Sequence, residues 1–432
     1  MLIRFRVENY KSFNGEQELS MVPGESRDHQ DHVYSIKGES ALRTAVVFGA
    51  NASGKTNMVR AMAASRNFIL GFPFKSEDYC RVSESNRSKP TGFEYTIEIN
   101  NRIFIYGLEV NLSNGTVESE WLSELHGSRP TRIFHREKNN IHTDLNLNQE
   151  DNMFFKVYTA EANVNRNMTF MLIFSRTPIN PKSQLSSIRM VLDWFSQSLR
   201  IVAAGTAPFN RTKKINDFID RSIARYGTGI TSVKYKKLAP SVYSQMISSD
   251  FVYSLVAANK QNKAGAYSTV RLPNGIFTIS MAPDGSPVVS KMVYEHDGVM
   301  FEYDEESDGT NRLMELLPVL DDSDVKGITY VIDELDRSLH PQLTQKFVRD
   351  FEALPSALKR QLIITTHESR LMDLELLRRD EIWFVSKDKD GSSELYSLEE
   401  FRERKDRKID KSYLEGRYGG VPSFMDVFPN LE

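Results

Sequence analysis

The sequence has a single cysteine, Cys80, among its 432 residues. One cysteine cannot form a disulfide within the chain, and such low usage is typical of proteins in a reducing compartment. The first ten residues, MLIRFRVENY, carry Arg and Glu where a secretory signal needs an apolar stretch. We therefore expect a cytoplasmic protein.

Long hydrophobic runs are missing as well. The longest, Met168 to Phe174 with Thr169 inside it, is far shorter than the roughly 20 residues that cross a bilayer. The sequence also lacks internal repeats and low-complexity tracts. With 40% hydrophobic and 26% charged residues, its composition is that of a globular protein and excludes a disordered or collagen-like chain. The length indicates two or three domain-sized units, or one large domain with an insertion.

A large net charge is the third feature that the sequence lacks, because 55 Lys and Arg nearly balance 58 Asp and Glu. Two opposed blocks hide behind this balance. Residues 182–237 hold eleven Lys or Arg and three Asp, whereas residues 295–334 hold thirteen Asp or Glu and two basic residues. We hypothesise that the basic block contacts nucleic acid or an acidic partner surface; a solvated helical lid is the alternative.

Hydrophobic periodicity predicts an α/β fold. The expected elements are a hairpin over 2–21, a buried strand over 45–48, a helix over 56–68, a β meander over 92–135, further β structure over 275–303, a helix over 310–320, a strand over 328–332, a helix over 341–354, a strand over 362–365 and a hairpin over 381–397. Residues 144–263 have mostly helical spacing without sustained heptads. We expect a discontinuous domain of residues 1–143 and 264–432, with a mainly helical insertion at 144–263.

One segment fits the phosphate-loop pattern G-x-x-x-x-G-K-[ST], between a predicted strand and a predicted helix. Its glycines let backbone N–H groups surround a phosphate chain at a helix N-terminus, whose dipole favours anions. Lys55 would reach the β and γ phosphates, and the Thr56 hydroxyl would bind Mg²⁺. The predicted nucleotide-binding residues are Gly49, Ala50, Asn51, Ala52, Ser53, Gly54, Lys55, Thr56 and Asn57.

A second segment, ITYVIDE at 328–334, is an apolar strand that ends in two adjacent carboxylates. Two acids at the end of a buried strand are costly unless they meet something cationic. Asp333 could hold Mg²⁺ while Glu334 takes a proton from an attacking water. A strand that simply ends in solvent is the alternative.

Two shorter segments complete the set. His367 follows the strand 362–365 and could hydrogen-bond a γ-phosphate and hold the water in line. Ser307 and Gly309 open a predicted helix and could form another phosphate-facing N-terminus, although a plain N-cap by Ser307 or Asp308 explains the local pattern equally well.

The order of these segments resembles the ABC-type ATPase heads of SMC and RecF proteins. The segment Asn9 to Phe13 resembles the first strand and turn of those heads, where basic and hydroxyl side chains such as Lys11 and Ser12 approach the nucleotide. More narrowly, three segments resemble the RloA-type ATPases of bacterial anti-phage and abortive-infection loci. They are residues 333–341 (DELDRSLHP), residues 365–367 (TTH) and residues 413–422 (YLEGRYGGVP).

The resemblance implies an ABC-type P-loop NTPase head with a β-meander lobe and a parallel-sheet lobe, which binds ATP and Mg²⁺. It also implies a homodimer or higher homo-oligomer that sandwiches ATP, with Ser307 and Gly309 of one copy facing Lys55 of the other. We thus predict an ATP-hydrolysing, dimerising switch that acts as sensor or regulator of a defence system with a separately encoded, nuclease-like or Toprim-like effector. An ATP-gated scaffold without turnover and a DNA-repair ATPase of the SMC/RecF type are the alternatives.

Overall fold

The computed structural model describes residues 1–36, 38–127, 129–176, 178–202, 213–260, 268–272, 275–321, 326–401 and 408–421. The chain forms two compact units. The first unit comprises Met1–Ile201, Lys326–Glu334 and Pro355–Glu432, and the second comprises Val202–Val325 and Leu335–Leu354. None of the described helices is both long and apolar enough to cross a lipid bilayer.

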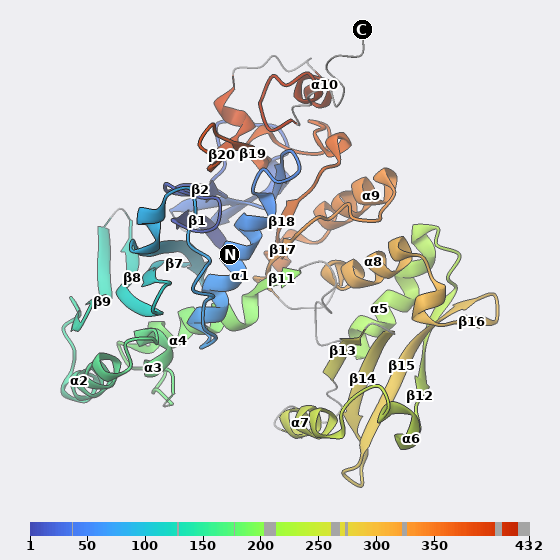
Figure 1. Ribbon diagram of the computed structural model, residues 1–432, viewed down its shortest axis with the longest axis horizontal. Helices are drawn as coiled ribbons and strands as arrows, with labels where there is room; N and C mark the ends of the chain where they lie inside the picture. The colour runs from blue at the N-terminus through green and yellow to red at the C-terminus, as the bar shows by residue number, and fades with distance from the viewer. Residues whose placement is uncertain are drawn as a thin grey trace. The chain divides into compact units, whose positions relative to one another are not determined.

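A seven-stranded antiparallel sheet in the first unit contains the predicted meander, in the order β10-β9-β8-β7-β6-β1-β2 (Figure 1). Alternation of apolar and charged residues explains how β1 sits in it: Phe5 and Val7 are buried, whereas Arg6 lies on the other face and pairs with Glu18 and Glu94. The strands are β1 (Leu2–Glu8), β2 (Gln17–Ser20), β6 (Thr91–Ile99), β7 (Arg102–Asn111), β8 (Thr116–His126), β9 (Arg129–Glu137) and β10 (Asn140–His142).

The second sheet of the first unit has the order β11-β17-β18-β5-β19-β20. Strands β17, β18, β5 and β19 run parallel, and β20 is antiparallel to β19. All five residues of β5 are buried, as expected for a parallel strand covered on both faces. The strands are β5 (Thr44–Phe48), β11 (Leu199–Val202), β17 (Thr329–Ile332), β18 (Gln361–Thr365), β19 (Ile382–Lys387) and β20 (Ser393–Ser397). A separate two-stranded ribbon pairs β3 (Val33–Ile36) with β4 (Glu39–Leu42).

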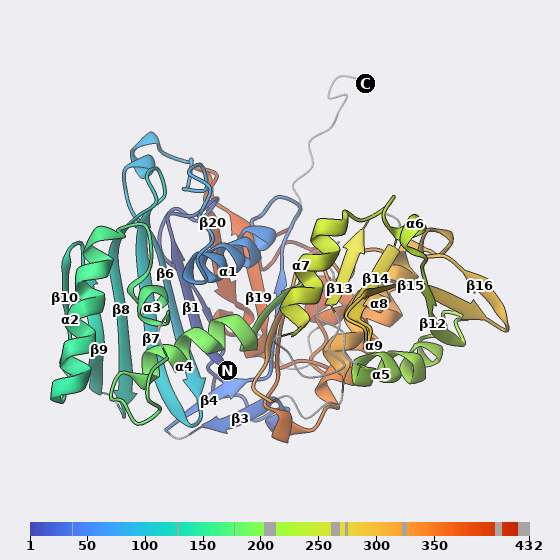
Figure 2. The same ribbon diagram turned by 90° about the horizontal axis from the view of Figure 1, so that it is seen from below.

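Helix α1 (Lys55–Ile69) joins these two sheets. Its buried residues Met58 and Met62 share one hydrophobic core with Tyr95 of the meander and Val47 of the parallel sheet. Figure 2 shows α1 between strands of the two sheets. The predicted α/β fold class, with a β-meander lobe and a parallel-sheet lobe, is confirmed.

Helices α2 (Gln149–Val164), α3 (Phe170–Phe174) and α4 (Ser186–Asp193) pack on the meander sheet of the first unit. Phe170 of α3 contacts Phe134 of β9 at 4.8 Å between ring centroids and Phe155 of α2 at 5.5 Å. The later part of residues 144–263 belongs to the second unit. These residues therefore do not form a single inserted body, because the apolar face of α2–α4 is buried against the sheet.

The second unit contains an antiparallel sheet in the order β12-β15-β14-β13, with β16 paired to β15. Tyr243, Val252 and Val256 pack on Phe277 and Ile279 of this sheet. The elements are α5 (Lys213–Ile223), β12 (Ser232–Lys237), α6 (Pro240–Tyr243), α7 (Ser249–Lys260), β13 (Ser268–Leu272), β14 (Gly275–Met281), β15 (Pro287–His296), β16 (Val299–Phe301), α8 (Asp308–Leu316) and α9 (Pro341–Glu352). Of the expected domain boundary at 263/264, both residues lie outside the described part of the chain.

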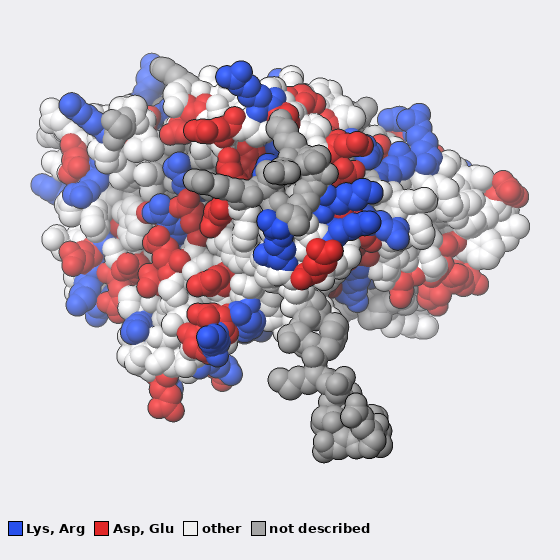
Figure 3. Space-filling view, turned by 90° about the horizontal axis from the view of Figure 1, so that it is seen from above, with Lys and Arg blue, Asp and Glu red and all other residues white. Residues whose placement is uncertain are grey.

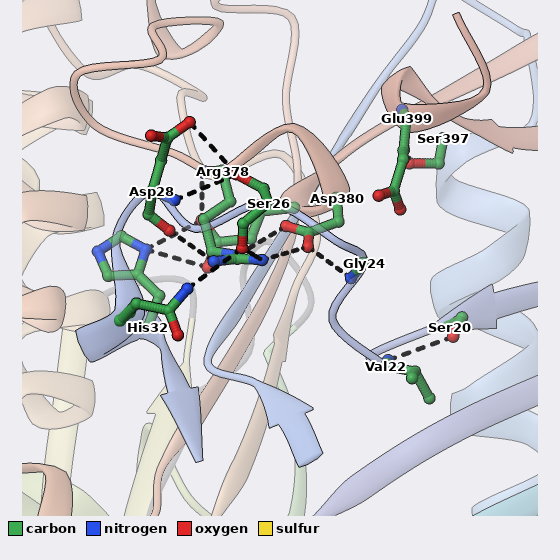
Figure 4. A network of polar contacts seen from close by, with 12 residues as sticks. Ser20, Val22, Gly24, Ser26, Asp28, His32, Arg378, Asp380, Ser397 and Glu399 are labelled. Carbon is green, nitrogen blue, oxygen red and sulfur yellow. Dashed lines mark hydrogen bonds and ion pairs between the residues drawn. The ribbon is translucent and has the colours of Figure 1, made fainter. Parts of the chain in front are cut away.

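A buried polar network in the first unit fixes the loop before β3 to the turn before β19 (Figure 4). The Arg378 guanidinium donates to Asp380 Oδ1 at 2.8 Å and to the backbone carbonyls of Asp28 and Ser26. His32 Nδ1 lies 3.0 Å from a carboxylate oxygen of Glu381. Burial raises the pKa of Glu381 well above its usual value.

Candidate nucleotide-binding site

The predicted phosphate loop lies between β5 and α1 and folds tightly against neighbouring backbone. Gly54, the N-cap of α1, has φ 123° and no side-chain cap. A Cβ atom at Gly54 would lie 2.4 Å from Ser393 Oγ and 2.9 Å from Ser12 Oγ. A Cβ atom at Gly49 would lie 2.4 Å from the carbonyl oxygen of Val385. Only glycine fits either position, which leaves the backbone N–H groups at the start of α1 accessible to an anion.

Lys55 is folded back over this loop. Its Nζ donates to the carbonyl oxygens of Gly49 at 2.7 Å and Ala50 at 3.0 Å, and the side chain is buried. The Ser53 hydroxyl is buried and has no hydrogen-bond partner among the described residues. A buried cation, an orphaned hydroxyl and an uncapped helix start in one loop fit a phosphate chain.

Strand β17 brings the predicted acids beside α1. Thr56 Oγ1 lies 3.3 Å from Asp333 Oδ1, and Thr365 Oγ1 donates to the same oxygen at 2.7 Å. A hydroxyl and a carboxylate oxygen are the ligands that Mg²⁺ takes beside a phosphate chain. Thr56 and Asp333 therefore fit the predicted metal site.

Glu334 is held by its backbone. Its N–H donates to Thr365 Oγ1 at 2.8 Å, and its φ of 48° is rare for a residue with a side chain. Thr365 thus contacts both acids. The sequence identified its strand but not its role, which depends on β18 pairing with β17 in the sheet.

The ends of three neighbouring strands carry the predicted residues. Strands β17, β18 and β5 are parallel and adjacent, so their carboxyl ends lie at one edge of the sheet. Asp333 follows β17, His367 follows β18 and Gly49 follows β5. The Thr366 N–H donates to the Val47 carbonyl at 3.1 Å, which fixes the end of β18 next to the phosphate loop. His367 is exposed at this edge.

Lys11 and Ser12 lie in the turn after β1. Ser12 Oγ accepts a hydrogen bond from Asn57 Nδ2 at 2.9 Å, so two predicted binding residues meet at the first turn of α1. Lys11 Nζ instead pairs with Asp78 Oδ1 at 2.6 Å.

The C-terminal segment also reaches the phosphate loop, a contact that the sequence did not reveal. A Cβ atom at Gly420 would lie 3.6 Å from Gly49 Cα. Tyr413, in α10 (Ile409–Leu414), donates to the Gly420 carbonyl at 2.9 Å, and its ring stacks on Phe384 of β19. Burial raises the pKa of Tyr413 to about 12, so this donor stays protonated near neutral pH. Pro422, the last residue of this motif, lies outside the described residues.

Ser307 and Gly309 belong to the second unit. Ser307 is the N-cap of α8, where its Oγ accepts from the Thr310 N–H at 3.1 Å. A Cβ atom at Gly309 would lie 2.6 Å from the Ser338 carbonyl oxygen. Within this unit Ser307 acts as the plain N-cap that the sequence offered as an alternative, and Gly309 allows a close backbone contact.

Solved structures similar to this chain include three SMC heads. The SMC head domain from Thermotoga maritima has 14% identity and a TM-score of 0.38, covering 92% of this chain and 98% of its own. The SmcHead bound to the C-winged helix domain of ScpA has 15% identity and a TM-score of 0.41, with 92% and 97% coverage. The Pyrococcus furiosus Smc head, solved with an extended coiled coil and the C-terminal domain of ScpA, has 13% and 0.38, with 92% and 97% coverage. These values are too low to carry an argument about function.

Curated protein sequences give no match to this chain. A protein-family model described as "AAA domain, putative AbiEii toxin, Type IV TA system" matches residues 45–151 and 184–373, which are more than half of the chain and include the phosphate loop, both acids and His367. The chain therefore belongs to this family of P-loop AAA-domain proteins.

Proposed function

We propose that the protein hydrolyses ATP to ADP and phosphate with Mg²⁺. One observation carries the proposal. At the sheet edge where three parallel strands end, the Asp333 carboxylate accepts a hydrogen bond from Thr365 Oγ1 and lies 3.3 Å from Thr56 Oγ1. A metal-binding hydroxyl, a carboxylate and a phosphate loop at one sheet edge are the parts that phosphoryl transfer needs.

The residues divide the reaction between them. The loop N–H groups and Lys55 hold the phosphates, and Thr56 and Asp333 hold Mg²⁺, which neutralises phosphate charge when it is bound. Glu334 takes the proton of the attacking water, and His367 hydrogen-bonds the phosphate being transferred. Asn57, in the first turn of α1, and Lys11 and Ser12, in the turn after β1, support the nucleotide.

ATP-dependent dimerisation is the second part of the proposal. Ser307 and Gly309 of one copy contact the nucleotide held by Lys55 of another, so ATP binding joins two copies and hydrolysis releases them. The N-terminus of α8 supports this role, since Ser307 and Asp308 are exposed there and a helix N-terminus favours anions.

The cellular role is a third part. The family description names a toxin of a type IV toxin–antitoxin system. Together with the resemblance to RloA-type ATPases, this supports a sensor or regulator ATPase in bacterial anti-phage defence, acting in the cytosol with a separately encoded effector. The effector would be nuclease-like or Toprim-like.

Nucleic-acid binding by the basic block is not favoured by its placement. Lys182, Arg189 and Arg200 belong to the first unit, whereas Arg221, Arg225, Lys234, Lys236 and Lys237 belong to the second. Figure 3 shows basic and acidic side chains interspersed over the face drawn. The described basic residues thus do not share one body.

The test measures ATP affinity and phosphate release for the purified wild-type chain, Lys55→Ala and Lys387→Ala. Lys55→Ala should weaken ATP binding at least tenfold because it removes the phosphate-facing cation. Lys387, an exposed lysine whose Nζ donates to the Gly391 carbonyl in its own hairpin, is the matched control. ATP binding without measurable phosphate release by the wild type would support the scaffold alternative and contradict the proposed hydrolysis.

A further inference from the structure

Helix α2 is apolar on two opposite faces. Phe155, Tyr158 and Ala162 are buried against the rest of the first unit. The other face exposes a second apolar row: Met153 is 58% exposed, Val157 57% and Val164 82%, with exposed Ala160 between them. A helix on the surface of a domain normally presents polar residues to solvent. This outward row, residues 153, 157, 160 and 164, is called the α2 seam.

The spacing of the α2 seam is that of a helix-pairing surface. Steps of four, three and four residues place these side chains within about 60° of one another around the helix at 3.6 residues per turn. The same steps describe alternating a and d positions of a heptad over three turns. Figures 1 and 2 show α2 at the β9–β10 end of the meander sheet, on the outside of the first unit.

The charges beside the α2 seam are self-complementary. Exposed Lys156 flanks it on one side, and half-buried Glu161 on the other. The two are five residues apart, which is the offset between facing flank positions of two parallel paired helices. In an antiparallel pair each flank would instead face its own copy, Lys156 against Lys156 and Glu161 against Glu161.

We propose that the α2 seam binds the same seam of a second copy of this chain, with the two helices parallel and Lys156 facing Glu161 of the partner subunit. Apolar layers would exclude water along the pair, and the two flanking ion pairs would set its direction. Glu161 also holds Arg176 at 2.9 Å, and this bond orders its side chain on the flank. The contact needs no nucleotide. It is therefore separate from the proposed ATP-dependent dimer, and the two contacts together would join more than two copies.

Cysteine cross-linking tests the direction of the pair. In a Cys80→Ser background, Val157→Cys should form a disulfide-linked dimer under mild oxidation without nucleotide, because parallel pairing places each Val157 opposite its counterpart. Phe72→Cys, which lies outside α2 and is 63% exposed in the wild type, is the matched control. Cross-linking of Val157→Cys no greater than that of Phe72→Cys would overturn the proposal. Linkage only in the Val157→Cys/Ala160→Cys double variant would indicate an antiparallel pair and would also overturn it.

Charge exchange tests the partner. Without nucleotide, Lys156→Glu should weaken self-association at least fivefold in sedimentation experiments, and Lys156→Glu/Glu161→Lys should restore it. Val157→Asp should weaken it more than Phe72→Asp. Adding Lys55→Ala should change none of these results. Failure of the ATPase proposal would therefore be distinguishable from failure of the proposed α2 pairing. A wild-type chain that stays monomeric without nucleotide at micromolar concentration would overturn the inference, and the seam would then suit a helix of another protein.

Discussion

The Thr365 hydroxyl donates to Asp333 Oδ1 at 2.7 Å, across the parallel strands β18 and β17. The same oxygen atom of Thr365 accepts the backbone N–H of Glu334 at 2.8 Å. One buried side chain thus orients the proposed metal ligand and the backbone of the proposed base. This arrangement makes Thr365 a positioning residue, which acts through its two neighbours.

Thr365→Val should lower the phosphate-release rate about 10- to 100-fold, because residues that orient metal ligands have effects of that size. ATP affinity without Mg²⁺ should change little, since the phosphate loop is untouched. Thr365→Ser, which keeps the hydroxyl, should recover most of the rate.

Thr329→Val is the control for Thr365→Val. Thr329 is buried at the start of β17, the parallel neighbour of the strand that ends at Thr365, and its hydroxyl donates to Gln361 Oε1 at 3.0 Å. Both variants lose a buried hydroxyl, but Thr329 lies at the edge of the sheet opposite the proposed metal site. Equal losses of activity in the two variants would argue against a positioning role for Thr365.

Gly54→Ala should reduce ATP affinity at least tenfold. The added Cβ atom would collide with Ser393 Oγ, 2.4 Å away, at a φ of 123° that side chains rarely adopt. The matched control is Gly391→Ala, which has φ 87° and no atom within 4 Å of the added carbon. Calorimetric titration with ATP measures the affinity, and a thermal melt confirms that both variants fold. Unchanged affinity in folded Gly54→Ala would contradict the proposed loop geometry.

Gln361→Leu should lower the free energy of unfolding by about 3 kcal/mol or more, because it leaves several buried polar groups unpaired. Gln361 is buried; its Oε1 accepts from Leu2 N at 2.6 Å, and its Nε2 donates to the carbonyls of Leu2 and Leu42. These bonds tie β1 of the meander to the parallel sheet. Urea titration measures the change, and exposed Gln30→Leu should stay within about 0.5 kcal/mol.

Glu381 should make the first unit less stable as pH rises. Burial raises the pKa of the folded-state carboxyl well above its usual 4.5, so the folded chain keeps a proton that the unfolded chain has lost. The associated stability is present below pH 4.5 and is lost as pH rises through the folded-state pKa. Glu381→Gln should remove a slope of up to about 1.4 kcal/mol per pH unit. Exposed Glu375→Gln should leave the slope unchanged; a wild-type slope retained in Glu381→Gln would refute the assignment.

Most of the secondary structure could be predicted from local pattern. Strand β5 is a short apolar run followed by glycine, and β1 alternates, so their types follow from burial on two faces or one. Helical spacing likewise located α1, α8 and α9. The domain division could not be predicted from spacing alone. Residues 144–263 read as one helical block, yet α2–α4 bury their apolar face on a sheet that lies before them in the chain.

The phosphate loop and the acids could be predicted because each is a contiguous motif. Thr365 and Ser393 could not, since their roles depend on which strands become neighbours in the sheet. The contact of Gly420 with Gly49 is another such case, as 371 positions separate the two residues in the chain. A single sequence does not show which residues so far apart in the chain come into contact in the fold.

The most direct test of the proposed chemistry is a single-turnover experiment with the Glu334→Gln variant. Rapid-quench measurement should show ATP bound with near wild-type affinity but phosphate formation slowed at least about 100-fold, because the variant cannot accept the proton of the attacking water. Glu368→Gln is the control. Glu368 follows His367 and caps the turn at Ser369–Leu371, and its change to the amide should retain the wild-type rate. Phosphate formation by Glu334→Gln at the wild-type rate would contradict the assignment of Glu334 as the base.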